Sequence, residues 1–350
     1  MTELRIDKIE VIDCSEFAGP GDDAHVVAVH AAGLTGWYGP VSTAVAALID
    51  THVGPLVVGA AVAEHEALIA RVRPHLGSPV GELTSWAVGA LDCAVWDLHG
   101  RAEFRPVAAL LSSPPTPEAV PAYASWLRLD IELDTNADEI ARLAGQGWQF
   151  TKWSLRPHPH RQVATDAVRL ARLVRQVADV TGGTAAFDAL WTWDDELTLG
   201  FAAAVDHDKM IWLEEPLNTY NLRRYTSLAA ASPPLALGER LHLGDDPTAM
   251  LGLPGLCALT LDVVGCGGLT AALHLTRLAA AAGVPVYPHG RSLVPAVHLA
   301  AALPEAVGAV EYQVQWEPRR RRLFTDPFPC DAGKIPVPRS PGLGPVPRRR

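Results

Sequence analysis

The chain is poor in cysteine and in long apolar runs. Its five cysteines are scattered and form no CxxC pair, so neither a disulfide framework nor a zinc site is indicated. No run approaches the roughly 18 uninterrupted apolar residues that a transmembrane helix needs. Residues 1–13 lack the long apolar region of a signal peptide. We therefore expect a cytoplasmic protein that is neither exported nor inserted into a membrane.

An excess of positive charge is also missing. The 350 residues include 29 basic and 39 acidic ones, which gives a formal net charge of −10 at pH 7. This balance argues against nucleic acid or an anionic membrane as a partner, and the basic runs at 319–322 and 348–350 are expected to be solvated surface. With 49% hydrophobic residues, the chain is long enough to bury a large core in more than one domain.

The first third of the chain predicts a small mixed domain. Residues 3–14 and 24–31 alternate apolar and polar positions, which indicates an antiparallel hairpin or meander. Apolar residues at helical spacing predict a long helix over 85–101. Three prolines between 114 and 117 then mark a linker. The expected divisions are an N-terminal α+β capping domain over 1–117, a catalytic domain over 118–322, and a C-terminal segment over 323–350 that packs on the capping domain.

After the linker, short apolar runs alternate with helical stretches such as 163–180 and 268–282. Buried parallel strands have this appearance, and crossover helices separate them. Eight such units in about 200 residues match the size of a (β/α)₈ barrel. The candidate strands lie at 120–126, 149–155, 184–189, 210–214, 234–239, 258–263, 284–288 and 308–312.

Three successive runs end on a carboxylate, at Asp188, Glu214 and Glu239. The intervals of 26 and 25 residues correspond to one strand, its return helix and two short loops. Because the carboxyl ends of parallel barrel strands meet at one mouth, the three acids would converge there. Oxygen ligands of this kind suit Mg²⁺ or Mn²⁺. The spacing therefore predicts a metal site.

Further polar residues occupy equivalent positions along the same series of strands. Asp262 and His289 follow the apolar residues of two later runs, and Glu311 lies within the last run. Lys152 lies inside an earlier run, although only four of the 29 basic residues are lysines, so its presence in a strand is not an accident of composition. These four residues are the candidates for proton chemistry.

In this order and at this spacing, the pieces resemble the enolase superfamily, in its mandelate racemase subgroup (the mandelate racemase/muconate lactonizing enzyme family). The likeness spans nearly the whole chain and is strongest to acid sugar dehydratases such as L-rhamnonate dehydratase. Each motif is weak alone, but the ordered set is specific. The matching segments are Ala90–Leu98, Trp212–Pro216, Gly238–Arg240, Asp262 with Gly267–Gly268, and Pro288–Ser292.

The resemblance implies an α/β fold, a (β/α)₇β TIM-like barrel with an N-terminal α+β capping domain. It also implies one Mg²⁺ per subunit, held by Asp188, Glu214 and Glu239. The shared reaction of such enzymes begins by removing the proton α to a carboxylate, and a divalent cation stabilises the enediolate that forms. A homo-oligomer, from dimer to octamer, is expected.

The resemblance assigns the base to His289, oriented by Asp262, since a neighbouring carboxylate raises the basicity of an imidazole. Glu311 would hydrogen-bond a substrate oxygen if it were protonated. Lys152 would neutralise the substrate anion or share the role of acid. The residues expected to bind substrate are Arg156, His158, Arg291, Tyr38 and Trp191, together with the capping-domain loops at 17–23 and 38–41.

One departure from the family pattern narrows the chemistry. Racemases of this subgroup carry Lys-x-Lys on the second barrel strand, where this chain has Lys152 and Ser154. Racemisation needs a base on each face of the carbon, and a neutral serine is a poor base. Muconate-lactonising relatives have a lysine where Asp262 stands, which disfavours that subgroup.

The expected function is therefore the Mg²⁺-dependent dehydration of a sugar acid (an aldonate) to a 2-keto-3-deoxy acid, a lyase reaction through a metal-stabilised enediolate. Two alternatives stay open. One is an isomerase: a racemase or epimerase, or a cycloisomerase, acting on a hydroxy acid or an anhydro sugar acid. The other is a barrel that binds an acid sugar without turnover. In each case the partner is a small sugar acid, not nucleic acid or membrane.

Overall fold

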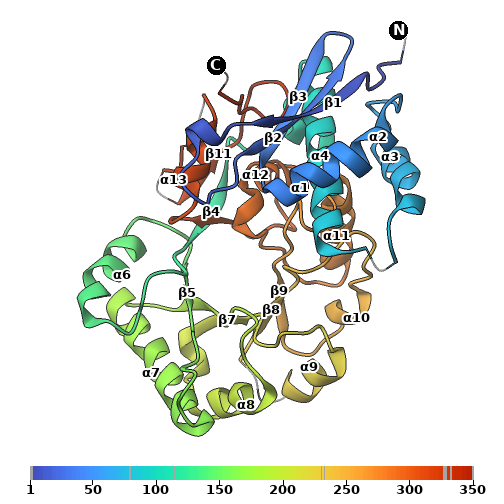
Figure 1. Ribbon diagram of the computed structural model, residues 1–350. Coiled ribbons are helices and arrows are strands. Elements are labelled where there is room, and N and C mark those ends of the chain that lie inside the picture. The colour runs from blue at the N-terminus through green and yellow to red at the C-terminus, as the bar shows by residue number, and fades with distance from the viewer. Residues whose placement is uncertain are drawn as a thin grey trace.

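The computed structural model describes residues 3–78, 80–112, 115–229, 231, 233–325, 329–331 and 333–348. A ring of strands surrounded by helices lies beside a smaller group of strands and helices formed by the N-terminal third of the chain (Figure 1). Of the three linker prolines, Pro114 falls outside the described residues. None of the described helices is long and apolar enough to cross a membrane.

The capping domain opens with the predicted meander. Strands β1 (Lys8–Asp13), β2 (His25–Ala31) and β3 (Leu34–Val41) form an antiparallel sheet in that order. Between β2 and β3, Ala32 and Gly33 both have positive φ, as a two-residue hairpin turn of the I′ type requires. The helical elements of this domain are η1 (Ser15–Phe17), α1 (Thr43–Leu48), η2 (Ile49–Val53), α2 (Gly54–Val57), α3 (His65–Val72), η3 (Arg73–His75), α4 (Glu82–Ala102) and α5 (Val107–Leu111).

Helix α4 confirms the long helix predicted over 85–101, and it is buried over most of its length. Two of its acids link it to other parts of the chain. Asp92 accepts hydrogen bonds from the backbone N and the hydroxyl of Thr270, at the start of a barrel helix. Asp97 accepts from the backbone N of Trp37 in β3 and of Leu343 in the C-terminal segment. Helix α4 thus fixes the capping sheet to the barrel.

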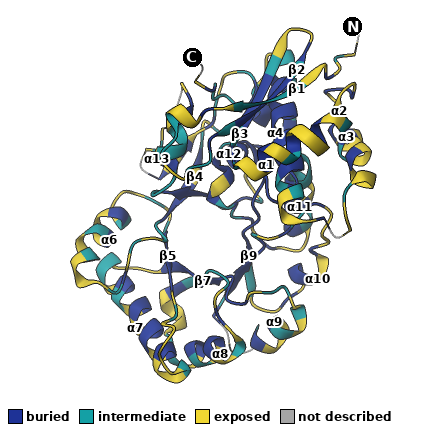
Figure 2. Ribbon diagram, in the orientation of Figure 1, coloured by how far each residue is buried: buried dark blue, intermediate teal, exposed yellow. Residues whose placement is uncertain are grey.

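The barrel strands run parallel in the order β10-β4-β5-β6-β7-β8-β9. They lie inside a ring of helices whose outward faces are exposed (Figure 2). The strands are β4 (Ala119–Ser125), β5 (Thr151–Ser154), β6 (Ala185–Asp188), β7 (Met210–Glu214), β8 (Leu235–Leu237), β9 (Leu256–Leu259) and β10 (Val310–Gln313). The helices between them are α6 (Ala137–Ala144), α7 (Val163–Thr181), α8 (Asp195–Ala204), α9 (Leu222–Ala229), α10 (Thr248–Leu251), α11 (Leu269–Ala281) and α12 (Leu293–Ala302).

The seventh predicted strand, 284–288, is the one that does not form a ladder. Val286 makes single bridges to Leu259 on one side and Val307 on the other, so the chain still follows the barrel wall. Pro285 and Pro288 explain the interruption, because proline has no N–H to donate to a neighbouring strand. The fold is the expected (β/α)₇β TIM-like barrel with an N-terminal α+β capping domain.

The barrel interior is layered. Tyr123, Phe150, Trp212 and Tyr287 form an aromatic cluster with several alanines from neighbouring strands. Side chains two residues apart along a strand point to the same face. The polar residues two positions beyond this cluster on several strands therefore form the next layer, at the carboxyl ends of the strands, where barrels of this kind carry their sites.

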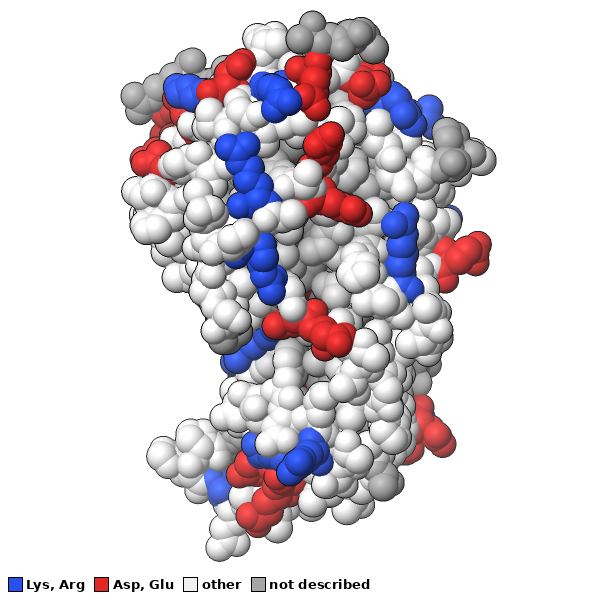
Figure 3. Space-filling view, turned by 90° about the vertical axis from the view of Figure 1, so that its right-hand side faces the viewer, with Lys and Arg blue, Asp and Glu red and all other residues white. Residues whose placement is uncertain are grey.

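The C-terminal segment contacts both the capping domain and the barrel. After α13 (Glu317–Arg320) and η7 (Arg321–Leu323), strand β11 (Lys334–Pro336) pairs antiparallel with β4. Farther on, the carbonyl of Gly342 accepts from the backbone N of Val107 in α5. On the face of the molecule shown in Figure 3, basic and acidic residues are interspersed with broad uncharged areas.

Candidate active site

The acids at the strand ends lie close to a buried lysine. Asp188 ends β6 and is in register with Glu214, which ends β7. Lys152, in β5, is fully buried, and its Nζ lies 2.8 Å from Glu214 Oε1, 3.7 Å from Asp188 Oδ2 and 3.1 Å from Glu311 Oε1. The lysine thus neutralises part of an acidic cluster that three separate strands contribute.

The electrostatics of this cluster show an excess of negative charge. Burial, together with the neighbouring carboxylates, raises the pKa of Asp188 to about 6 and that of Glu214 to about 8, even though Lys152 opposes both shifts. Although burial opposes it, the surrounding acids raise the pKa of Lys152 well above its usual value. Among these acids Lys152 is therefore an ammonium group, whose N–H groups face the carboxylates.

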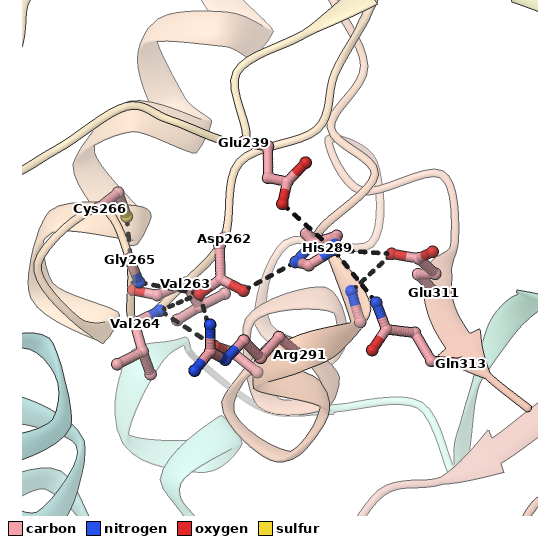
Figure 4. A network of polar contacts seen from close by, with 12 residues as sticks. Glu239, Asp262, Val263, Val264, Gly265, Cys266, His289, Arg291, Glu311 and Gln313 are labelled. Carbon is pink, nitrogen blue, oxygen red and sulfur yellow. Dashed lines mark hydrogen bonds and ion pairs between the residues drawn. The ribbon is translucent and has the colours of Figure 1, made fainter. Parts of the chain in front are cut away.

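The donor set fits a divalent cation in its chemistry. Carboxylate oxygens are the ligands that Mg²⁺ prefers, and a cation would offset the negative charge that one lysine leaves uncompensated. The arrangement is not that of a closed metal site: among the described residues, no group of three His, Cys, Asp or Glu side chains is placed to hold a metal. Lys152 instead contacts two of the predicted ligands, and the third, Glu239, points toward His289 (Figure 4).

His289 and Asp262 lie within hydrogen-bond distance of each other. The imidazole Nδ1 lies 3.1 Å from Asp262 Oδ2, and the other oxygen of Asp262 accepts from the hydroxyl of Ser292 and from two backbone N–H groups (Figure 4). Although burial opposes it, these hydrogen bonds and His289 lower the pKa of Asp262. An ionised Asp262 fixes the hydrogen of the neutral ring on Nδ1 and leaves the Nε2 atom of His289 as the basic one.

The groups around His289 Nε2 have opposite effects on whether this nitrogen carries a hydrogen. Although burial opposes it, Glu239 and Glu311, with Oε atoms 3.5 and 3.8 Å away, contribute to raising the pKa of His289 to about 10. The amide Nε2 of Gln313, at 3.1 Å, can only donate and so requires a lone pair on the ring. The hydrogen-bond geometry decides for the neutral ring, because the Gln313 amide can only donate to Nε2 while Nδ1 faces the Asp262 carboxylate, which can only accept.

Glu311 is ionised in this structure. Although burial opposes it, Lys152 and the hydrogen bond from the backbone N of Gly290 lower the pKa of Glu311. Its Oε2 accepts from the backbone N of Gly290, where a side chain would collide with Gln313 and the Glu311 backbone. The protonated Glu311 considered from the sequence is therefore not the form that its neighbours favour.

A cavity of about 360 Å³ reaches His289 from the side of the capping domain. Asp22 and Asp23 of the capping-domain loop line it and pair with arginines of the barrel side: Arg319 Nη1 lies 3.0 Å from Asp22 Oδ1, and Arg291 Nη2 lies 3.0 Å from Asp23 Oδ2. The loop at 17–23 thus meets the barrel mouth beside the proposed base. The remaining lining residues include Gly21, Pro40, Leu127, Gln313, Trp316, Arg320 and Leu323.

The five residues predicted to bind substrate are not brought together. Arg291 lines the cavity with His289, and Tyr38 lines a small neighbouring one with Arg291 and Arg320. Arg156 and His158 line a separate cavity of about 280 Å³. The ring of Trp191 stacks under the guanidinium of Arg240, at 3.7 Å, in the loop that follows Asp188. Their role in binding substrate stays a prediction.

Three polar residues of the cavity were missed from the sequence: Gln313, Arg319 and Arg320. The two arginines belong to the basic run that was expected to be solvated surface, but Arg319 pairs with Asp22, and Arg320 donates to Gln313 Oε1. A run of arginines gives no signal in the sequence of the direction in which each side chain points. Gln313 had a signal, because it lies two residues beyond Glu311 and therefore faces the barrel interior with it.

Comparison with known proteins identifies the family. A family model described as the mandelate racemase/muconate lactonizing enzyme N-terminal domain matches residues 22–112, and one described as enolase C-terminal domain-like matches residues 136–350. The chain belongs to the mandelate racemase/muconate lactonizing enzyme family. Both models are parts of the enolase superfamily that the sequence motifs resemble.

Individual relatives are distant. The chain is 27% identical to L-rhamnonate dehydratase of Saccharopolyspora erythraea over 85% of its own length and 75% of that protein. It is 24% identical to D-gluconate dehydratase of Thermoproteus tenax over 74% of its own length, and this match spans only 54% of the relative. The crystal structure of a mandelate racemase/muconate lactonizing protein from Paracoccus denitrificans, complexed with magnesium, superposes with a TM-score of 0.83 at 24% identity, covering 99% of this chain and 96% of that one.

Proposed function

We propose that the chain is a Mg²⁺-dependent dehydratase of sugar acids that converts an aldonate to a 2-keto-3-deoxy acid. The observation that carries this proposal is that His289 is placed to act as a base, whereas Lys152 is not. His289 reaches the cavity and carries a lone pair on Nε2 in its neutral form, whereas Lys152 is a buried ammonium held by three carboxylates. A racemase needs a second base, and neither Lys152 nor Ser154 can serve as one.

Ser154 supports the same conclusion. Its hydroxyl donates to the carbonyl of Leu127 at 2.8 Å, and it lines the cavity of Arg156 and His158, not that of His289. The position that carries the second base in racemases of this family thus holds a neutral side chain engaged with the backbone. The names of the relatives, which include L-rhamnonate and D-gluconate dehydratases, support the lyase reading.

In the reaction, His289 Nε2 takes the proton from the carbon α to the substrate carboxylate, and the electron pair of that C–H bond moves toward the carboxylate. Asp262 stabilises the imidazolium that results. Bound Mg²⁺, for which Asp188, Glu214 and Glu239 are the proposed ligands, would supply positive charge against the developing enediolate. Lys152 adds a fixed positive charge near the same acids.

In the second half, the β C–O bond breaks as the enediolate collapses, and the proton on His289 Nε2 passes to the departing hydroxyl, which leaves as water. The resulting enol rearranges to the 2-keto-3-deoxy acid. A single residue therefore acts first as base and then as acid, which balances the proton within each turnover. Dehydration therefore requires only one group that can act as both base and acid, and His289 can fill both roles.

The direct test is to incubate the purified protein and Mg²⁺ with a library of sugar acids and assay for 2-keto-3-deoxy product. We expect product from at least one aldonate, none after chelation of the metal, and none from His289→Asn. If every acid is returned unchanged although some of them stabilise the fold, the chain is a binder and not a dehydratase.

A further inference from the structure

Gln313 faces the proposed base from inside the cavity. It ends β10, two residues after Glu311, so both side chains point into the barrel. Only 5% of Gln313 is exposed, and its amide nitrogen lies 3.1 Å from His289 Nε2 (Figure 4). The atom of His289 that must meet a substrate proton is thus already in contact with a side chain that has no role in the scheme above.

Two independent contacts determine which end of this amide faces the histidine. Arg320 can only donate, and its Nη2 lies 2.9 Å from Gln313 Oε1, so the oxygen is turned toward Arg320. On the other side, Asp262 already accepts from Ser292 and two backbone N–H groups, so His289 donates to it through Nδ1. The N–H of Gln313 and the lone pair on His289 Nε2 then match.

Arg320 is itself held in place. Its Nη1 donates to the carbonyl of Gly290, the residue that follows His289, at 2.9 Å. The buried carboxylate of Glu317 lies 3.6 Å from the same Nη1. One guanidinium therefore fixes both the backbone next to the base and the amide that faces it, so that an unbroken chain of contacts runs from Glu317 to Asp262.

We propose that Gln313 is a positioning residue for His289, an inference that rests on the proposed role of His289 as the base. Held by Arg320, the amide N–H keeps the Nε2 lone pair directed into the cavity in the absence of substrate, while Asp262 holds the other side of the ring. The α C–H of an incoming sugar acid replaces this N–H, and the amide is then free to donate to a substrate oxygen beside the reacting carbon.

Two substitutions separate this role from simple packing. Gln313→Met keeps the length but removes the N–H, so we expect kcat to fall about tenfold, the size of one ordinary hydrogen bond, with a smaller change in KM. Gln313→Glu keeps the shape and the contact with Arg320, but a carboxylate can only accept, so it places the hydrogen on His289 Nε2. We expect this closer isostere to lose more than a hundredfold in kcat.

The matched control is Gln315→Glu. The side-chain oxygen of Gln315 accepts from the backbone N of Arg128, and a carboxylate can accept there equally well. We expect kcat of this variant to stay within twofold of the parent. If Gln313→Glu is as active as Gln313→Met or better, Gln313 acts through its shape, and the proposal is wrong.

A second readout does not depend on turnover. Diethyl pyrocarbonate attacks the unprotonated nitrogen of histidine, and peptide mapping by mass spectrometry reports the modification of His289 alone. We expect His289 to react faster in Gln313→Met, because its lone pair is uncovered, and more slowly in Gln313→Glu. Equal rates in the three proteins would overturn the proposal. Because the reagent needs no substrate, this result stands even if no sugar acid is turned over, in which case only the proposed function fails.

Discussion

His298 gives a prediction about stability whose size follows from its contacts. This residue, in α12 of the barrel, is fully buried, and its Nδ1 accepts from the backbone N of Ala108 in α5 while its Nε2 lies 3.0 Å from the carbonyl of Leu343. An Nδ1 that accepts and an Nε2 that donates define the neutral ring. His298 therefore joins the barrel, the capping domain and the C-terminal segment only when it is uncharged.

The size of the effect comes from the pKa. Burial lowers the pKa of His298 from 6.5 to about 4, against the hydrogen bond to Leu343. Below pH 6.5 the unfolded chain binds a proton that the folded chain does not, so the free energy of unfolding falls as the pH falls from 6.5 to about 4, and this contribution is complete above 6.5. A shift of this size corresponds to about 3 kcal/mol.

The assay is denaturant unfolding of the parent and of His298→Asn across that pH range. Asparagine can still accept from Ala108 but carries no titrating group, so the parent should lose about 3 kcal/mol relative to the variant on acidification. His75→Asn, at an exposed histidine, is the control and should follow the parent. A difference between His298→Asn and the parent that does not change with pH would refute the reasoning.

Three further outcomes are expected. Lys152→Met leaves its carboxylate partners without their cation, so the free energy of unfolding should fall by about 3 to 5 kcal/mol. Mg²⁺ should stabilise the variant more than the parent in thermal unfolding, because the added cation replaces part of the lost positive charge. Equal stabilisation would contradict binding of the metal by the acids that Lys152 contacts. Glu239→Gln should weaken Mg²⁺ binding in calorimetry, whereas His289→Asn should leave Mg²⁺ binding unchanged and abolish turnover. Weaker Mg²⁺ binding in His289→Asn but not in Glu239→Gln would contradict the assignment of Glu239 as a ligand and His289 as the base. Asp97→Ala leaves two buried backbone N–H groups without their acceptor. The free energy of unfolding should therefore fall by about 3 kcal/mol. A loss under 1 kcal/mol would show that water replaces the carboxylate.

The spacing of strand ends made much of the fold predictable. The acids at Asp188 and Glu214 recur at the period of one strand and one helix, and they lie side by side in register in the sheet. The strand at 284–288 was predicted from its apolar residues alone, whereas Pro285 and Pro288 decide that it forms single bridges. The domain boundaries at 117 and 322 stay predictions, as does the oligomeric state.

The site was predictable where a residue's position along a strand fixes its direction, and less so elsewhere. His289 and Asp262 meet because they follow neighbouring segments of the barrel wall. Arg156 and Arg291 were placed in one site, but loop residues carry no such constraint, and they line different cavities. The spacing did not predict that Lys152 contacts the proposed metal ligands. A lysine side chain is long and flexible, so the charges around it determine which groups it contacts.

The most direct test of one-sided chemistry at His289 is turnover of an active sugar acid in D₂O, followed by analysis of both product and recovered substrate. We predict a 2-keto-3-deoxy product and recovered substrate that keeps its configuration at C2, because neither Lys152 nor Ser154 can deliver a deuteron from the opposite face. Recovered substrate that contains the C2 epimer carrying deuterium would show a second base and would contradict the assignment of the chain as a dehydratase with His289 as its single base.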